Sequence, residues 1–440
     1  MFCPHKNSYL QLVCAMNPRV INKAVDQAME KSEFDPHCDQ PAAQRPTSMQ
    51  PSLYAPHVDI TRARMGFGRV GLRIINRELH SEDDLVQLQA IHTVLDQVQI
   101  SESALFLIDL HVVYRIIDLM EHRNPIIREK ICLILTHLAT YYQGRKQIMS
   151  RAIIIDNLLW LILRDRKEIR FVAATTLKTL ARDRCSCEII MKHEKIVEDL
   201  LKVVKNEHSG IVLIHLQTLT CFGEWDPARL LKANAFQIML TLFTDRDTKI
   251  ISAAMDCMTQ LCKDDIGKIL ADEYDITFFL RPYLMSTSVE VIISAINLMA
   301  YTTLTTRSKW RAKECMRLPK RLVDLCHTPN KPVLQLGAMQ VLMNLCDMPD
   351  IRNHIKMNMD KNVKAIKIRD HEDWDGTTET SSYGLETGHN YRTMSIEQVE
   401  TIKSDFGDNA LAVNVHSYLK RLHELKARLI FAIHKKSYRH

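Results

Sequence analysis

The stretch that decides the fold is LMEHRNPIIREKICLILTHLATYYQGRKQIMSRAIIIDNLLWLI, residues 119–162. It opens with a polar turn that ends at Pro125, and an apolar stretch with helical spacing follows as far as Leu138. Gly144 then breaks the pattern, and a second apolar helical stretch runs to Ile162. This segment therefore predicts a unit of packed helices joined by short polar connections.

Similar units follow one another along the chain from about Leu79 to Asn358. One apolar position near the start of each long helix sets the register, and successive copies lie 41, 42, 42, 39, 41 and 42 residues apart. This period falls in the range of armadillo and HEAT arrays, about 40–47 residues, and exceeds the roughly 33–34 residues of ankyrin and tetratricopeptide repeats. The seven register positions are Val86, Ile127, Ile169, Ile211, Ile250, Val291 and Val333.

A single unit would expose an apolar face on each side, and stacking the units in a row buries both faces. We therefore predict an all-α fold, an armadillo/HEAT-type helical-repeat superhelix of about seven units with a long concave surface. The connector Tyr142–Gln147 is long enough for a short first helix, which favours the three-helix armadillo unit. Small residues one turn after the register positions would let the long helices pack closely: Ala90, Ala173, Ala174, Ala253, Ala254, Ser294, Ala295, Gly337 and Ala338.

The composition agrees with a helical chain, because glycine (12) and proline (14) are scarce among 440 residues. No stretch reaches the roughly 20 apolar residues of a membrane span, and the N-terminus lacks the pattern of a secretory signal. We therefore expect a cytosolic protein with reduced cysteines. The net charge of +6 is a mild excess for this length and does not indicate a nucleic-acid partner.

The chain outside the repeats divides into three further segments. Residues 1–53 are predicted to be a weakly structured extension with one short helix, and residues 54–358 hold the repeats. Residues 359–395 are predicted to form a flexible acidic linker, because residues 370–391 carry six acidic side chains and no lysine or arginine. Residues 396–440 are predicted to be a basic amphipathic C-terminal helical segment.

The predicted C-terminal helix, about residues 409–435, carries the candidate protein-binding residues. It has an apolar face and a basic face, and three roles remain open: a cap that docks on the end of the superhelix, a contact for a partner helix or acidic surface, or a membrane-surface helix. The membrane role is disfavoured because the apolar face lacks Trp or Phe anchors apart from Phe431. The candidate residues are Lys420, Arg421, Lys426, Arg428, Lys435 and Lys436.

No catalytic motif is present, since P-loop, zinc-protease, serine-hydrolase and kinase signatures are all missing. Cys185, Cys187 and His193 suggest a metal site, but their spacing lacks a second ligand pair. We therefore predict a non-enzymatic protein with no catalytic, cofactor-binding or metal-binding residues and no small-molecule substrate. The tryptophan–asparagine ladder of nuclear import receptors is also missing, because Trp160 is followed one turn later by Arg164 and Asn344 is preceded one turn earlier by Gln340.

The segment before the repeats carries a more specific signal, TRARMGFG at residues 61–68 and NRELHSEDDL at residues 76–85. It resembles the N-terminal signature of the radial spoke head protein 14 family, the armadillo-repeat proteins of the ciliary axoneme. The similarity covers roughly residues 54–350. The matching residues are Tyr54, Pro56, Asp59, Thr61, Ala63, Gly68, Leu72, Asn76, Glu78, Leu79, Ser81, Asp83 or Asp84, and Leu85.

The resemblance implies a structural subunit of the radial spoke in motile cilia or sperm flagella, with other axonemal and spoke proteins as partners. It implies a location in the cytoplasm, at the cytoskeleton of the ciliary or flagellar axoneme, and no active residues. No nucleic-acid or membrane partner is predicted, given the mild net charge and the few aromatic anchors of the C-terminal helix. The first 50 or so residues and the part after about Asp360 depart from the family's pattern. The alternative prediction is a soluble cytosolic armadillo adaptor or transport factor that binds protein partners reversibly.

Overall fold

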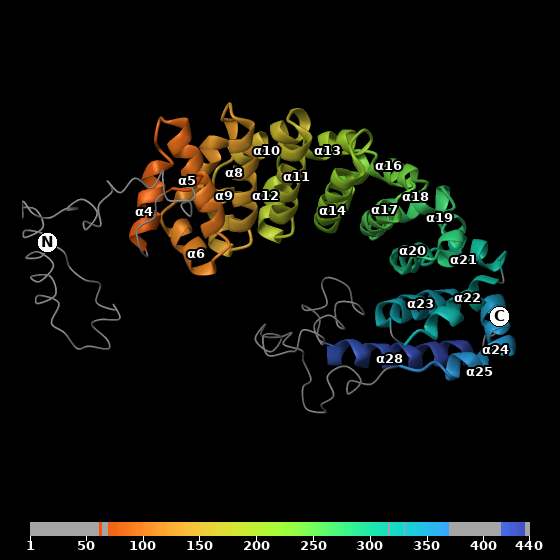
Figure 1. Cartoon of the computed structure of the whole chain (residues 1–440). Helices are drawn as coiled ribbons and strands as arrows, with labels where there is room; N and C mark the ends of the chain where they lie inside the picture. The colour runs from red at the N-terminus through yellow and green to blue at the C-terminus, as the bar shows by residue number, and fades with distance from the viewer. Residues whose placement is uncertain (1–60, 64–68, 316, 330, 369–414, 436–440) are drawn as a thin grey trace, which may run out of the picture.

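The computed structural model describes residues 61–63, 69–315, 317–329, 331–368 and 415–435, and all regular elements in these ranges are helices. Figure 1 shows a curved row that starts at α4 (Arg69–Glu78) and ends at α28 (Val415–His434). Among the described helices, none combines the length and apolar character that crossing a membrane would require. The predicted all-α repeat architecture is confirmed.

Seven long helices form one side of the row, and each packs against the next. From α14 onward they lie on the inner side of the curve (Figure 1). All seven predicted register residues fall near their starts; the five central ones are at most 2% exposed, and the first and last are partly buried. The helices are α5 (Asp84–Gln97), α8 (Pro125–Leu138), α11 (Lys167–Ala181), α14 (Ser209–Trp225), α17 (Thr248–Leu261), α20 (Val289–Thr302) and α23 (Pro332–Leu345).

Two shorter helical segments precede each of the long helices from α8 to α23, so these units have the three helices of an armadillo repeat. The first helices are α6 (Ser101–Asp109), α9 (Tyr142–Met149), α12 (Arg184–Met191), α15 (Pro227–Lys232), α18 (Asp265–Glu273) and α21 (Thr306–Lys313). The second are α7 (Val112–Asp118) with η2 (Leu119–Glu121), α10 (Ile153–Arg164), α13 (Ile196–Val204), α16 (Ala235–Leu242), α19 (Ile276–Phe279) with η3 (Arg281–Met285), and α22 (Arg317–Cys326).

Short polar side chains start several of the long helices. The side-chain oxygens of Asp83, Asn124 and Asp247 each accept a hydrogen bond, 2.9–3.0 Å long, from the backbone N–H two residues later. These bonds satisfy N–H groups that have no partner within the helix. Pro125 lacks an N–H and therefore suits the first position of α8.

The turn from a long helix into the next first helix is tight. The structure places Gly144 inside α9, and a Cβ atom there would lie 2.1 Å from the carbonyl oxygen of Leu138 at the end of α8. Gly267 in α18 has the same environment, with 2.0 Å to the corresponding carbonyl. Ser186 and Ser308, both 3% exposed, occupy the equivalent positions of α12 and α21. The residue expected to break the helical pattern is thus a close-packing position within a helix.

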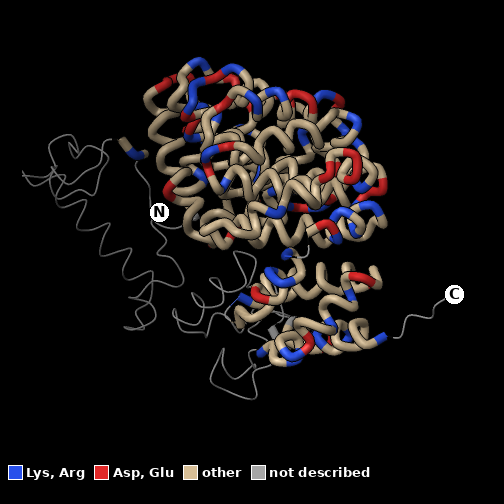
Figure 2. Tube along the Cα trace, turned by 90° about the vertical axis from the view of Figure 1, so that its right-hand side faces the viewer, with Lys and Arg blue, Asp and Glu red and all other residues tan. Residues whose placement is uncertain are grey.

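Polar bonds tie each unit to its neighbour across about one repeat length. Arg128 binds both carboxylate oxygens of Asp165, at 2.7 and 2.9 Å, and Arg170 binds Glu207 in the same way at 2.7 and 3.0 Å. Burial raises the pKa of Asp165, but hydrogen bonds from Arg128 and from the Arg166 N–H outweigh it and hold the pKa below its ordinary value. Figure 2 shows basic and acidic residues interspersed over the described array.

The C-terminal end of the array continues past residue 358 through α24 (Pro349–Asn358) and α25 (Asp360–Lys364). Helix α28 then packs against α23 and α24, in the place of the next long helix (Figure 1). Its apolar face joins the common core. The buried residues of this face are Leu419, Leu422, Leu425, Leu429 and Ile433, none more than 7% exposed.

This arrangement corrects the predicted start of the acidic linker at residue 359. Met359, Val363 and Ile366 are at most 5% exposed and belong to the array, so the packed chain extends to residue 368. A single short turn of helix carries too little periodicity to be recognised in the sequence. The rest of the predicted linker, the predicted extension 1–53 with its short helix, and residues 396–414 of the predicted C-terminal segment lie outside the described residues.

Candidate protein-binding surfaces

The six basic residues predicted to bind a partner do not share one surface. Lys420, Arg421 and Arg428 are exposed on α28. Lys426 instead turns inward, and its Nζ donates a hydrogen bond of 2.7 Å to the carbonyl oxygen of Ile366. Its ammonium therefore fastens α28 to the chain that follows α25.

The last turn of α28 is held by further polar contacts. Lys435 is exposed, and its carbonyl oxygen accepts a hydrogen bond of 3.3 Å from Arg352. The Nε2 atom of His434 lies 2.9 Å from Asp360, and the neighbouring Lys364 and His434 hold the pKa of this carboxyl group below its ordinary value. Lys436 lies outside the described residues.

These contacts bear on the three roles left open for the C-terminal helix. Its leucine face is buried against α23 and α24 and is not available to a membrane or a partner helix. Phe431, with 73% of its surface exposed, is the large apolar side chain that α28 still presents to solvent among its described residues. The helix is thus docked as a cap, and Lys420, Arg421 and Arg428 form what we call the α28 basic face.

The long helices offer a second surface that the sequence analysis missed. Four polar side chains recur six or seven residues after the register positions of α14, α17, α20 and α23, and all are exposed or partly exposed: Gln217, Asp256, Asn297 and Gln340. Burial raises the pKa of Asp256 to about 6, against the opposing effect of a hydrogen bond with Ser294. Aligning the units on their register positions would have shown this polar row; the search for a tryptophan–asparagine pair could not.

Trp160 and Asn344 do not lie together on the surface of the long helices. Trp160 lies on α10, a second helix, and not on a long helix. Asn344 lies on α23 but is 7% exposed, and its amide donates to the carbonyl oxygen of Ala300 at 2.8 Å. Asn344 is therefore engaged within the packed array and Trp160 lies off the long helices, so the two residues do not form the import-receptor pair.

The two cysteines of the suggested metal site differ in exposure. Cys185 is exposed, whereas Cys187 is buried, which raises the pKa of its thiol to about 12. His193 lies 3.0 Å from Asp156. Within the ranges that the structure describes, no three His, Cys, Asp or Glu side chains gather in a way that could hold a metal ion.

Comparison with known proteins supports the fold and goes no further. No protein-family model matches the chain. The crystal structure of an engineered protein is 16% identical over 81% of this chain and 79% of its own length, with a TM-score of 0.58. A designed armadillo repeat protein in complex with the peptide (KR)4 is 13% identical over 52% of this chain and 99% of its own, with a TM-score of 0.49.

Together with the three-helix units, this likeness shows a helical-repeat superhelix of the armadillo type. Such arrays present long continuous surfaces built from successive units, and they typically act as binding scaffolds rather than enzymes.

Proposed function

We propose that this protein is a non-enzymatic structural scaffold of the ciliary or flagellar axoneme, acting as a radial spoke component that supports motility. The observation that carries the proposal is the junction of the armadillo-type array with the signature at residues 54–85. The array would supply the binding surfaces. The resemblance of the signature to the radial spoke head protein 14 family supports the axonemal location. Its partners would be other axonemal and radial spoke proteins.

The proposed mechanism is rigid presentation of surfaces along the superhelix. Bidentate pairs such as Arg128–Asp165 and Arg170–Glu207 fix the angle between neighbouring units, so a partner bound at one unit is held relative to a partner bound at another. The α28 basic face would contact an acidic surface at the end of the array. Complementary charge of this kind sets orientation and specificity more than affinity.

Fractionation of isolated cilia or flagella tests the location. The protein should remain with the axoneme after the membrane is extracted with detergent, and a tagged copy in a ciliated cell should decorate the length of the axoneme. A protein found entirely in the detergent-soluble pool would contradict the proposal.

The second candidate is a soluble cytosolic armadillo adaptor or transport factor. The polar row of Gln217, Asp256, Asn297 and Gln340 favours it, because amide side chains that both donate and accept hydrogen bonds, together with a carboxyl group that accepts them, suit an extended segment of a partner chain. Affinity purification from cytosol would then recover mobile partners that dissociate at moderate salt, and the axonemal fraction would be empty.

A further inference from the structure

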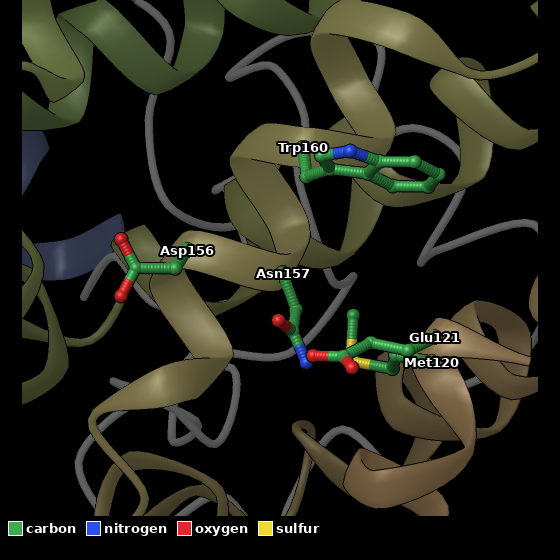
Figure 3. A pocket seen from close by; sticks show the side chains of 5 residues that line it. All are labelled: Met120, Glu121, Asp156, Asn157 and Trp160. Carbon is green, nitrogen blue, oxygen red and sulfur yellow. The ribbon is translucent and has the colours of Figure 1, made fainter.

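A cavity of about 380 Å³ opens between η2 of one unit and α10 of the next. It is lined by Met120, Glu121, Asp156, Asn157 and Trp160 (Figure 3). Figure 3 shows Trp160 on one side, Met120 and Glu121 facing it across the opening, and Asn157 pointing toward Glu121. Because this volume is at the lower end of the range for ligand sites, the cavity suits a single side chain better than a cofactor.

The charge of the lining is negative. None of its five residues is a lysine, arginine or histidine. Glu121 is exposed, and within the described part of the chain no cation pairs with it. Asp156 projects at the edge of the cavity, where Nε2 of His193 lies 3.0 Å from its carboxylate. Two carboxylates therefore line the cavity, and the one at its rim, Asp156, already lies beside His193.

Trp160 is 45% exposed, although six other residues of the helix that carries it are buried in the core. The guanidinium carbon of Arg128 lies 6.0 Å from the ring centroid, but the N–H groups of this arginine already donate hydrogen bonds to other residues. It bonds to both oxygens of Asp165 and to the carbonyl oxygens of His122 and Arg123. Arg128 thus supports the indole without filling the cavity.

We propose that this cavity binds an arginine side chain of a partner protein. A planar guanidinium can stack on the indole of Trp160 while its N–H groups donate to Glu121, and Met120 and Asn157 contact the aliphatic stem. Arginine fits better than lysine because an ammonium neither stacks nor forms a forked bond. The inference rests on the proposed protein-binding role but not on an axonemal location.

Fluorine NMR of the full-length chain labelled with 5-fluorotryptophan tests the proposal. The Trp160 resonance is identified by its loss in Trp160→Phe. Trp310 serves as an internal control, because the ammonium of Lys313 already lies 4.9 Å from its ring. The probes are N-acetyl-arginine amide, N-acetyl-lysine amide and N-acetyl-citrulline amide, the last being an uncharged analogue of arginine with nearly the same shape.

The arginine probe should shift the Trp160 resonance in a saturable way and leave Trp310 unchanged, while citrulline should have no effect. Glu121→Gln should weaken binding about threefold or more and Asp156→Asn less, because Asp156 lies at the rim. The matched control is Glu168→Gln, an exposed carboxylate on α11 that does not line the cavity. Both cavity carboxylates are on the surface, so these variants should fold, which circular dichroism checks.

A Trp160 resonance that responds equally to citrulline, or not at all to arginine, would overturn the proposal, as would equal binding of lysine and arginine. An unchanged affinity in Glu121→Gln would do the same. Failure of this titration leaves axonemal fractionation unaffected, and a detergent-soluble protein that still binds arginine at Trp160 would contradict only the cellular location.

Discussion

His215 lies in the middle of α14 with no exposed surface, and neither of its ring nitrogens has a hydrogen-bond partner. Burial lowers its pKa from 6.5 to about 4, with a small opposing effect from the charge of Glu207. The folded protein therefore keeps this ring neutral at pH values where the unfolded chain would protonate it. Its titration therefore costs no stability above about pH 6.5, and it lowers the free energy of unfolding as the pH falls from 6.5 toward 4.

Replacing His215 with leucine should leave stability at pH 7 unchanged or raise it, because an unsatisfied polar group is removed from the core. The decrease in the free energy of unfolding between pH 6.5 and 4.5 should be smaller in the variant than in the wild type. Asp256 acts in the opposite direction in both proteins, since its raised pKa makes the folded state more stable as the pH falls below about 6. Thermal unfolding at pH 7.5 and pH 5 compares variant with wild type, and an unchanged difference between the two pH values would refute this account.

Two helical glycines give a matched test of close packing. Gly267→Ala should destabilise the protein by about 1–3 kcal/mol, because the added methyl group meets the backbone carbonyl at the end of α17. Gly210→Ala in the first turn of α14 has nothing within 4 Å of the new Cβ and should stabilise by about 0.4–1 kcal/mol. Urea unfolding measures both, and equal effects of the same sign would contradict the packing at α18.

At the scale of the element, α28 decides how the array ends. A terminal unit must cover the apolar face of its inner neighbour and present a polar face to solvent. Helix α28 does both, since five apolar side chains pack on α23 and α24 while Lys420, Arg421 and Arg428 face outward. The helix is therefore part of the fold and also the carrier of a candidate contact surface, and these two roles can be tested separately.

Leu422→Ala and Leu429→Ala should each weaken the docking of α28 by about 2–5 kcal/mol, because both leucines are fully buried. Hydrogen exchange measured by mass spectrometry should show faster exchange in α28, α23 and α24. Exchange in α8 and α11 should stay as in the wild type, since units contact only their neighbours. Lys420→Ala is the control on the exposed side, and faster exchange throughout the array would show that the end is not a local unit.

Reversing the charge of the α28 basic face with Lys420→Glu, Arg421→Glu and Arg428→Glu together should release the protein from detergent-extracted axonemes without changing its melting temperature. The matched control reverses three exposed cations on other units, Lys205, Lys232 and Arg246. Immunoblots of the soluble and axonemal fractions measure the effect. Full retention of the α28 variant would exclude this face as an attachment site.

At the scale of the whole molecule, the chain is a row of neighbours rather than a body with one centre. Contacts join each long helix to the next, and the recurrent polar ties span 36–44 residues, about one unit. Stability is then close to a sum of unit and interface terms. Distant parts of the array are therefore coupled only through the units between them.

Variants that keep a single tryptophan, either Trp225 at the end of α14 or Trp310 in α21, should report different unfolding midpoints in urea. Trp225 lies mid-array beside Arg184, at 4.8 Å, and Trp310 lies three units later along the chain. Because each unit is coupled only to its neighbours, the units near the C-terminal end and those in the middle of the array can unfold at different urea concentrations. Coincident curves from both probes, and from circular dichroism, would show that the array unfolds as one cooperative block.

The repeat and its register could be predicted from the spacing of apolar residues within one unit, and the three-helix unit from the length of the connector between its longer helices. The sequence also located the basic helix at the C-terminus, but it could not tell that Lys426 faces inward, since that depends on Ile366, 60 residues earlier. The docking of α28 at the end of the row, and the cavity that Glu121 of one unit and Trp160 of the next both line, became visible only in the tertiary structure. Periodicity records which side of a helix is buried, whereas the neighbour that buries it is chosen by packing across the whole array.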